Sequence, residues 1–266
     1  GLPTRIAYTE HDLRRLAYNE EKAFRGCGLT RRDVVLLTCT LDRCFIAGLA
    51  YFLGIRSLGA TAIRNGHGTL NGHLELLRRI RPTALVGVPS FLCKLGHFLH
   101  ERGVDAAALG VRRIVVIGEP VRDRAMALLR AGRDLERLWG ARVYSTYASS
   151  EIVTSFCECT AQNGGHLPPD LAVVEILDER GRPLPAGEVG EVVVTPLAVE
   201  GMPLLRFRTG DLSFLLDAPC ACGRTTVRLG PILGRKAQML KVQGTTLYPP
   251  ALFDAVAEQE DVAEYY

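Results

Sequence analysis

Apolar residues follow two alternating patterns over the first 145 positions of the chain. Runs of four to six mostly apolar residues predict buried strands, and the segments between them carry apolar residues at helical spacing. The expected strands cover 34–38, 61–64, 84–88, 113–117 and 142–145, and the expected helices cover 45–58, 70–80, 90–101 and 122–138. Ahead of them, Thr9 is expected to cap a helix with an acidic first turn. The alternation predicts an α/β fold with a parallel sheet flanked by helices.

The pattern changes after residue 166, where short β segments follow one another without a convincing helix between them. The expected segments cover 171–177, 190–195, 203–207, 212–216 and 225–229. Such a series predicts a small antiparallel β subdomain or barrel. We therefore divide the chain into an α/β subdomain at 1–160, a small β-barrel-like subdomain at 161–233, and a hinge with the start of a further domain at 234–266.

Composition and charge exclude several classes of partner. The 266 residues are 47% hydrophobic, and their 32 basic and 29 acidic side chains give a net charge of +3, with no run of five or more basic residues. A dispersed charge of this size argues against a nucleic-acid surface. No apolar run reaches the roughly 18 residues that a membrane span needs. The N-terminus does not resemble a signal peptide, so we expect a cytoplasmic protein without a membrane partner.

Cysteines are clustered in two parts of the chain. Cys157 and Cys159 precede His166, and Cys220 and Cys222 form a second Cys-x-Cys pair. In a reducing compartment, two such pairs and a histidine have the ligand types of a tetrahedral zinc site. Reduced free thiols are the alternative. The other cysteines, at positions 27, 39, 44 and 93, lie in apolar surroundings and are expected to be small buried side chains.

Polar and glycine residues mark the ends of three expected strands. They are Pro89-Ser90, Gly118-Glu119-Pro120, and the run from Thr146 to Glu151. Ligands of open α/β sheets bind at the carboxyl ends of the strands. Ordinary strand-to-helix turns explain the first two motifs equally well, and Glu151 could simply cap a helix beginning at Ser149 or Ser150. Arg208-Thr209-Gly210-Asp211 is, in isolation, most often a plain turn.

The order of these motifs resembles the adenylate-forming superfamily. The motifs are Tyr147-Ala148-Ser149-Ser150-Glu151, Arg206 to Asp211, Gly234-Arg235, and Gly244 with Pro249. Within the superfamily, Glu158-Cys159, Gly165-His166, Met202 to Arg206 and Cys220 to Thr225 resemble the phenylacetate-CoA ligase branch. Each motif is short, but several in the same order along the chain are specific.

The resemblance implies a nucleotide site for ATP and AMP. Glu151 would bind Mg²⁺, with Thr146, Ser149 and Ser150 near the phosphate. Gly118, Glu119 and Pro120 would border adenine, and Tyr147, next to Ala148, would stack along adenine or wall the acyl site. Asp211 would accept hydrogen bonds from both ribose hydroxyls, and Arg235 would lie near the ribose or phosphate. Glu151 and Arg235 are therefore the expected catalytic residues.

The resemblance also assigns an acyl pocket and a metal site. Pro89, Ser90, Phe91 and Tyr147 would line the acyl pocket. Cys159, His166, Cys220 and Cys222 would bind a structural zinc ion, which leaves Cys157 as a buried thiol or an alternate ligand.

Three departures from the family pattern are visible. The Ser/Thr/Gly-rich phosphate loop would precede Gly1, and the catalytic lysine of the C-terminal domain would follow Tyr266. Lys236-Ala237-Gln238 stands where an acidic hinge residue is expected. The chain is therefore expected to be the central fragment of such an enzyme, with most of the C-terminal domain missing and little or no turnover on its own.

The expected activity is ATP-dependent, AMP-forming ligation of a carboxylic acid, by analogy an aromatic one, to coenzyme A. One alternative is an adenylating enzyme that passes the acyl group to a carrier-protein thiol or an amine. A second alternative is a catalytically silent adenylate-binding module. The apolar helix at 45–58 is a candidate contact for a homodimer.

Overall fold

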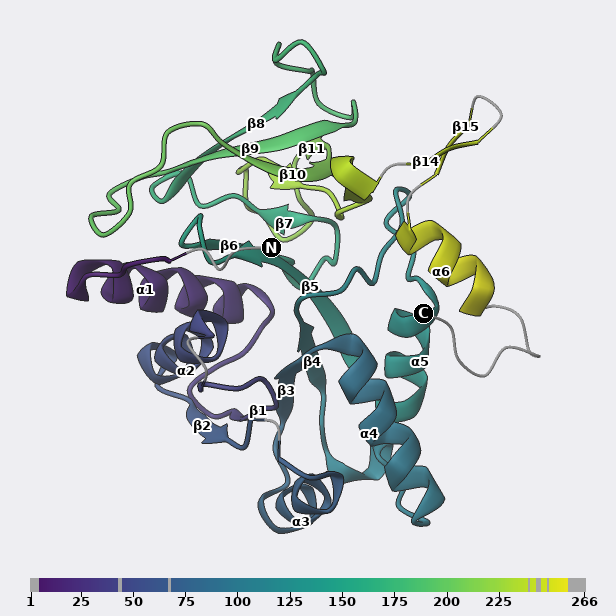
Figure 1. The fold of residues 1–266 in the computed structure, drawn as a ribbon. Helices are drawn as coiled ribbons and strands as arrows, with labels where there is room; N and C mark the ends of the chain where they lie inside the picture. Colours follow the sequence, from purple (N-terminus) through teal and green to yellow (C-terminus); the bar gives the residue numbers. More distant parts are fainter. Residues whose placement is uncertain are drawn as a thin grey trace.

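A six-stranded sheet forms the centre of the α/β part of the molecule (Figure 1). Its strands are β1 (Val34–Leu37), β2 (Thr61–Arg64), β3 (Ala84–Gly87), β4 (Arg113–Val116), β5 (Arg142–Ser149) and β6 (Thr154–Cys157). They lie in the order β2-β1-β3-β4-β5-β6, and the first five are parallel. β6 turns back antiparallel to β5, so the expected parallel sheet has one antiparallel edge.

The computed structural model describes residues 5–42, 45–66, 68–238, 240–242, 245–247 and 249–257. The predictions for Gly1, Cys44, Gly244 and Tyr266 lie outside the described residues.

Helices cover both faces of the sheet, as the sequence predicts. They are α1 (Glu10–Gly26) and α2 (Ile46–Leu58) on one face, and α3 (Leu70–Ile80), α4 (Pro89–Glu101) and α5 (Arg130–Trp139) on the other. Strand residues alternate between the two layers, since Leu36 and Ile114 join the α3–α5 core while Leu37 and Val115 join the α1–α2 core. A homodimer contact through α2 stays a prediction.

Thr9 begins α1 with a complete capping box. The Thr9 side chain accepts from the backbone of Asp12, and the Asp12 carboxylate accepts from the backbone of Thr9. Asp12 also accepts from the backbone N–H groups of Glu200 and Gly201, at 2.9 and 2.8 Å. The predicted cap is confirmed, and it fixes α1 to the loop that follows β9.

The predicted helix at 122–138 is wrong over its first half. Arg122 pairs with Leu128 in an antiparallel bridge, and Met126 between them has a φ of 68°. Helix α5 begins only at Arg130. Because the Arg122 side chain is buried against Glu158, tertiary contacts override the local helical pattern in this segment.

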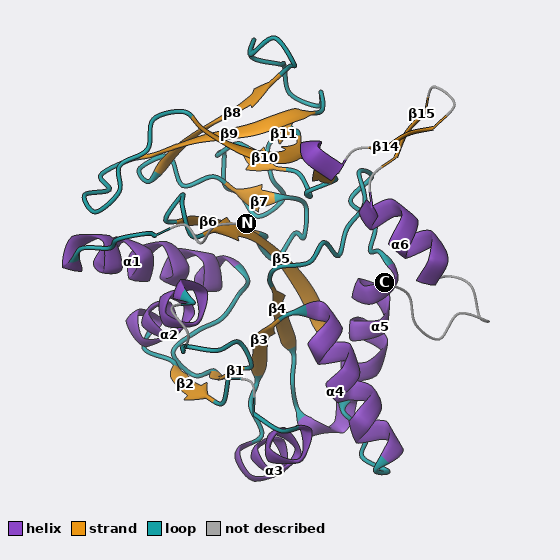
Figure 2. Ribbon diagram, viewed as in Figure 1, coloured by secondary structure: helices purple, strands orange, loops and turns teal. Residues whose placement is uncertain are grey.

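Two small antiparallel sheets form the β subdomain, which is the strand-rich upper part of Figure 2. A four-stranded sheet has the order β13-β10-β9-β8, and a three-stranded sheet has the order β11-β12-β7. Their strands are β7 (Gly165–His166), β8 (Ala172–Leu177), β9 (Gly190–Pro196), β10 (Phe207–Ser213), β11 (Leu215–Leu216), β12 (Arg228–Leu229) and β13 (Gly234–Arg235).

The prediction of a strand at 203–207 is also wrong, because β10 begins only at Phe207. Arg206, just before it, has a φ of 51°, a left-handed conformation that does not fit a strand. After β13 come a short 3₁₀ turn at Lys236–Gln238, the hairpin of β14 (Leu240–Val242) and β15 (Thr245–Leu247), and helix α6 (Pro249–Ala257). Another 3₁₀ turn, Ala107–Leu109, precedes β4.

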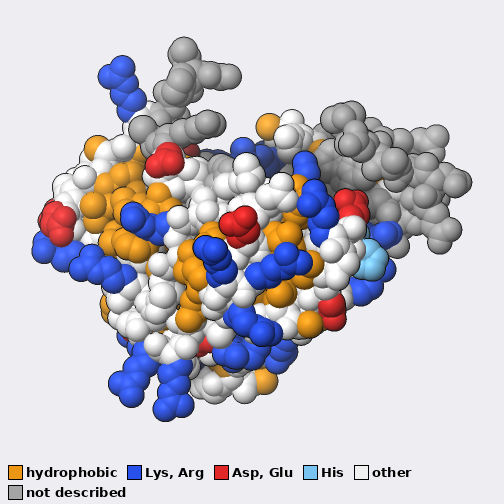
Figure 3. Space-filling view, turned by 90° about the horizontal axis from the view of Figure 1, so that it is seen from below, with side chains coloured by type: hydrophobic (Ala, Val, Ile, Leu, Met, Phe, Trp, Pro, Cys, Tyr) orange, Lys and Arg blue, Asp and Glu red, His pale blue; other side chains and the backbone are white. Residues whose placement is uncertain are grey.

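Basic side chains are scattered over the lower face of the molecule, with hydrophobic and acidic side chains between them (Figure 3). Within the described residues, no helix combines the length and apolar character that crossing a membrane requires. The absence of a nucleic-acid partner stays a prediction.

Candidate functional site

A cavity of about 460 Å³ opens where the carboxyl ends of β4 and β5 meet the β subdomain. This is the edge at which open α/β sheets bind their ligands. Nine of the ten residues expected to bind the nucleotide line it: Gly118, Glu119, Pro120, Thr146, Tyr147, Ala148, Ser149, Asp211 and Arg235. Ser150 is not among the lining residues. The cavity therefore brings together segments that are up to 120 positions apart, from Gly118 to Gln238.

Asp211 is the central charged group of one wall. Its Oδ2 accepts from the hydroxyl of Tyr147 at 2.8 Å, and its Oδ1 accepts from Nε of Arg235 at 2.8 Å. Asp211 lies on β10 opposite Arg235 on β13, so the register of the sheet sets this pair. Each carboxylate oxygen can accept a second hydrogen bond, so the group can still bind hydroxyls of a ligand.

Tyr147 joins this wall to the sheet. Its ring stacks on Phe156 with ring centroids 6.1 Å apart and an interplanar angle of 27°. Burial, together with the charge of Asp211, raises the pKa of Tyr147 well above its ordinary value. The hydroxyl therefore stays protonated and serves as a donor to Asp211.

Gly118 shapes the opposite wall. Its φ of 80° is a conformation that favours glycine, and the nearest atom to an added Cβ would be 3.9 Å away. The backbone angle explains this glycine better than crowding does.

Glu151 does not line the cavity. It lies in the turn between β5 and β6, next to Ser150, whose carbonyl accepts from the Tyr8 hydroxyl at 2.9 Å. Burial and then the charge of Glu151 raise the pKa of Tyr8 to about 12. No helix begins at Ser149 or Ser150, so Glu151 is not a helix cap. The magnesium role stays a prediction.

The expected acyl-pocket residues divide into two groups. Tyr147 lines the cavity, whereas Pro89, Ser90 and Phe91 are not among its lining residues. Glu119 accepts from both the backbone N–H and the hydroxyl of Ser90, at 2.9 and 2.7 Å. This contact caps α4 and ties the ends of β3 and β4 together. Phe91 instead packs its ring edge-on against His73.

A buried ion pair also lines the cavity, although its two residues were not predicted from the sequence to belong to the site. Nε of Arg122 donates to Oε1 of Glu158 at 2.6 Å, and the two side chains are 6% and 2% exposed. Burial raises the pKa of Glu158, and Arg122 opposes the rise. The signal in the sequence was a lone acid between Cys157 and Cys159 in an otherwise apolar strand end. Arg122 carried no signal because its segment was predicted to be helical.

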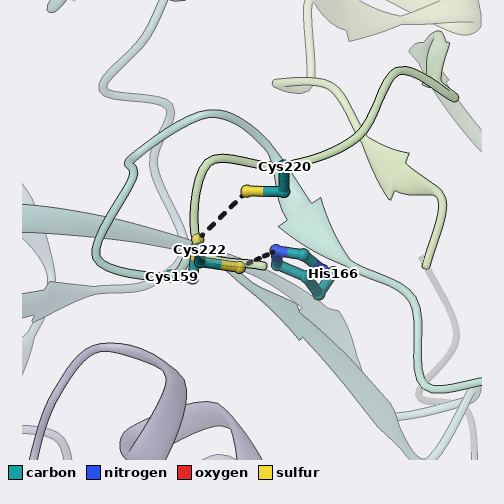
Figure 4. Close-up of side chains that lie close together, drawn as sticks. All are labelled: Cys159, His166, Cys220 and Cys222. Atoms are coloured by element: carbon teal, nitrogen blue, oxygen red, sulfur yellow. Dashed lines mark hydrogen bonds between the residues drawn. The ribbon is translucent and has the colours of Figure 1, made fainter. Parts of the chain in front are cut away.

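The four expected zinc ligands lie together beneath the β subdomain (Figure 4). The ligand atoms of Cys159, His166, Cys220 and Cys222 are all within 4.8 Å of one another. Sγ of Cys159 is 3.6 Å from Sγ of Cys220, and Sγ of Cys222 is 3.4 Å from Nε2 of His166. The prediction that these residues are close together is confirmed.

The pKa values of His166 and Cys222 suit metal ligands, whereas the pKa of Cys159 is too high for a thiolate at neutral pH. Burial and the charges of Arg224 and Arg228 lower the pKa of His166 to about 4, so its ring is neutral. Nδ1 faces the hydroxyl of Thr226 at 2.8 Å, which leaves Nε2 toward Cys222. Burial opposes ionisation of Cys222, but hydrogen bonds from Arg224 and the neighbouring thiols lower its pKa to about 7. Burial raises the pKa of Cys159 to about 12.

Cys157 is outside this cluster. Its Sγ is 3.3 Å from Sγ of Cys27 and accepts from the hydroxyl of Thr146 at 3.0 Å. Of the two roles left open for it, the buried thiol fits this position.

Comparison with known proteins gives consistent matches over the whole chain. Aligned over 270 residues, the chain is 32% identical to the phenylacetate-coenzyme A ligase of Thermus thermophilus and 30% identical to that of Pseudomonas putida. Each alignment covers 100% of this chain and 59% of the relative, so the chain spans about three fifths of these proteins.

A solved structure supports the fold. The 2-hydroxyisobutyryl-CoA ligase in its postadenylation state superposes with a TM-score of 0.88 over 97% of this chain and 55% of that one, at 23% identity. Residues 5–199 match the family profile described as AMP-binding enzyme. The chain therefore belongs to the AMP-binding enzyme family.

Proposed function

We propose that the chain is the central part of an ATP-dependent, AMP-forming acid–CoA ligase of the phenylacetate-CoA ligase type, acting on an aromatic acid. The observation that carries this proposal is the carboxylate of Asp211, held by Tyr147 and Arg235 in a cavity at the strand ends. The matches to two phenylacetate-coenzyme A ligases support the reaction and the class of acid.

The reaction would proceed in two steps at this cavity. An oxygen of the substrate carboxylate attacks the α-phosphorus of ATP, and the bond to the β-phosphate breaks and releases pyrophosphate. The thiol sulfur of coenzyme A then attacks the acyl carbon, loses its proton, and displaces AMP. The first step makes the second easier, because AMP is a better leaving group than hydroxide.

The residues of the cavity would bind and orient the nucleotide. Asp211 would accept hydrogen bonds from the ribose hydroxyls, with Tyr147 and Arg235 fixing the direction of its two oxygens. Arg235 is 63% exposed, so its guanidinium can turn toward a phosphate without a large desolvation cost. Gly118 to Pro120 would border the base, and Thr146 and Ser149 would lie near the α-phosphate.

Magnesium would be held at the hairpin between β5 and β6. Glu151 is the carboxylate there and would hold the ion. Bound to ATP, Mg²⁺ neutralises charge on the phosphate oxygens.

Cys159, His166, Cys220 and Cys222 form a thiol–imidazole cluster. Its donor atoms fit a structural zinc ion. Zinc bonds of about 2.0–2.3 Å in a tetrahedron place ligand atoms roughly 3.3–3.8 Å apart. Two of the ligand-atom distances, 3.6 Å and 3.4 Å, lie in this range, and all four atoms are within 4.8 Å of one another. Four protein ligands leave no open position, so the ion would tie Cys159 and His166 to the loop of Cys220 and Cys222.

Product analysis tests the proposed acceptor. AMP release is measured on the full-length protein that contains this chain, with ATP, Mg²⁺ and phenylacetate, adding coenzyme A, a carrier protein or an amine in parallel. Release that depends on coenzyme A supports the ligase, and release that depends only on a carrier protein or an amine supports the alternative acceptor. Tight AMP binding without AMP release in any arm supports a catalytically silent module.

A further inference from the structure

We propose that the buried Arg122–Glu158 ion pair positions the wall of the cavity that selects the base, so that adenine is preferred over guanine. This inference rests on the proposed function, because it takes AMP as the ligand of the cavity.

Arg122 and Glu158 both form hydrogen bonds with the backbone. Besides its bond to Glu158, Arg122 donates to the carbonyls of Met126 and Val143, at 3.2 and 3.3 Å. Oε2 of Glu158 accepts from the backbone N–H of Ser145 at 2.8 Å. All three nitrogens of Arg122 and both oxygens of Glu158 therefore have partners. These bonds hold the backbone at Met126, Val143 and Ser145, so both side chains act as positioning residues.

The segments that the pair holds are walls of one end of the cavity. Arg122 and Met126 belong to the segment that follows Gly118 to Pro120, and Ser145 belongs to β5. The backbone of Glu158 also donates to the carbonyl of Ser145 at 3.0 Å and forms a bridge with Gly165. The ion pair thus links the 122–126 segment, β5 and the residue that follows β6, all of which line the same cavity.

The charged groups divide the cavity into two ends. Asp211 accepts from Tyr147 and from Arg235 at the end proposed for the ribose, and Arg122 and Glu158 bond to each other. When the ribose binds at Asp211, the base lies against the walls that the ion pair holds. Adenine and guanine differ in the donors and acceptors on one edge, and a wrong base leaves buried polar groups unpaired. Such discrimination requires walls fixed within about 0.5 Å.

The ion pair contributes more to the geometry of the cavity than to the stability of the fold. Replacing a buried ion pair with uncharged residues of similar size is often neutral, whereas removing one partner leaves a buried charge. The variant that tests the inference therefore removes both charges together, as Arg122→Met with Glu158→Gln. Asp178→Asn with Arg182→Met is the matched control, since that ion pair is 2.8 Å long and lies on the β8–β9 turn, with Arg182 exposed and Asp178 half-buried.

The experiment measures dissociation constants of AMP, GMP and ribose 5-phosphate by calorimetry for the 266-residue chain and both double variants. The wild-type chain and the control are expected to prefer AMP to GMP by the same factor. The Arg122/Glu158 variant is expected to lose about tenfold of this preference, the worth of one hydrogen bond. Its affinity for ribose 5-phosphate is expected to stay unchanged, because Asp211 is untouched.

Two results overturn the inference while leaving the proposed function intact. One is an unchanged AMP-to-GMP ratio in a folded Arg122/Glu158 variant. The other is an equal loss of affinity for all three ligands, which indicates a general structural role. If the double variant does not fold, Arg122→Lys, which keeps the charge pair but loses the bonds to the carbonyls of Met126 and Val143, must still lower the ratio. A wild-type chain that binds none of the three ligands refutes the proposed function itself.

Discussion

The hydroxyl group of Tyr147 donates a hydrogen bond to Oδ2 of Asp211, although the two residues are 64 positions apart. Tyr147 is on β5 of the central sheet and Asp211 is on β10 of the β subdomain. Arg235 of β13 bonds the other oxygen of the same carboxylate. One buried acid therefore links the two parts of the fold at the cavity, and a ligand that binds Asp211 contacts both.

Replacing this acid is the most direct change to nucleotide binding. Asp211→Asn keeps the size of the side chain but removes the charge and one acceptor, which are worth about 1.5–3 kcal/mol in hydrogen bonds to a ligand. AMP affinity is expected to fall roughly 10- to 100-fold. Calorimetry measures the change, and Asp217→Asn on the exposed turn after β11 is the control. Equal affinities for the wild type and Asp211→Asn would contradict the role of Asp211.

Removing the Tyr147 hydroxyl tests how the acid is oriented. Tyr147→Phe keeps the stacking on Phe156 but removes the donor to Asp211. AMP affinity is expected to fall by less than in Asp211→Asn, on the order of fivefold, because the carboxylate remains and loses only one neutral partner. The same titration with AMP measures it. A loss as large as that of Asp211→Asn would show that Tyr147 contacts the nucleotide itself.

The zinc content of the purified chain tests whether the thiol–imidazole cluster binds zinc. Cys220→Ser is expected to lower bound zinc from one ion per chain to almost none and to reduce the melting temperature, because the ion joins two loops of the β subdomain. Plasma emission spectroscopy measures the metal, and a thermal scan measures stability. Cys93→Ser is the matched control, since Cys93 is a half-buried thiol of α4 outside the cluster. A wild-type chain purified with zinc in the medium and containing none would contradict the zinc assignment.

Glu20 of α1 makes stability depend on pH. Its side chain is 3% exposed, and burial raises its pKa to about 7, against a hydrogen bond with Ser155 that lowers it. Between pH 4.5 and 7 the folded chain keeps a proton that the unfolded chain releases, so the free energy of unfolding falls as pH rises. Glu20→Gln should remove this slope and stabilise the chain by about 3 kcal/mol at pH 8.

Urea titrations from pH 4.5 to pH 8 measure this effect. Glu101→Gln, at the exposed end of α4, is the control and should leave the pH dependence unchanged. A wild-type stability that does not change over this range would show that Glu20 is ionised, or solvated, in the folded chain.

The local pattern of apolar and polar residues was sufficient to predict most of the fold. The alternation of apolar runs and amphipathic stretches predicted the five parallel strands and the helices over both faces, and Thr9 marked the start of α1. These elements follow from short-range spacing and from capping, which a sequence displays directly. The segment from Arg122 to Leu128 failed because a buried contact with Glu158 determines its path.

The candidate site depended on long-range contacts that spacing does not show. The clustering of Cys159, His166, Cys220 and Cys222 was predicted from ligand type, and Asp211 was placed with the strand ends only through the family resemblance. Nothing in the order of residues placed Arg122 beside Glu158. Pro89 to Phe91 were assigned to the acyl pocket through the family resemblance, but Glu119 binds Ser90, and Phe91 packs against His73.

A crystal structure of the chain soaked with AMP tests the central claim most directly. The account predicts AMP in the 460 Å³ cavity, with ribose hydroxyls within hydrogen-bond distance of Asp211 and the base beside Gly118. AMP bound elsewhere, or a cavity that stays empty at saturating AMP, would contradict it.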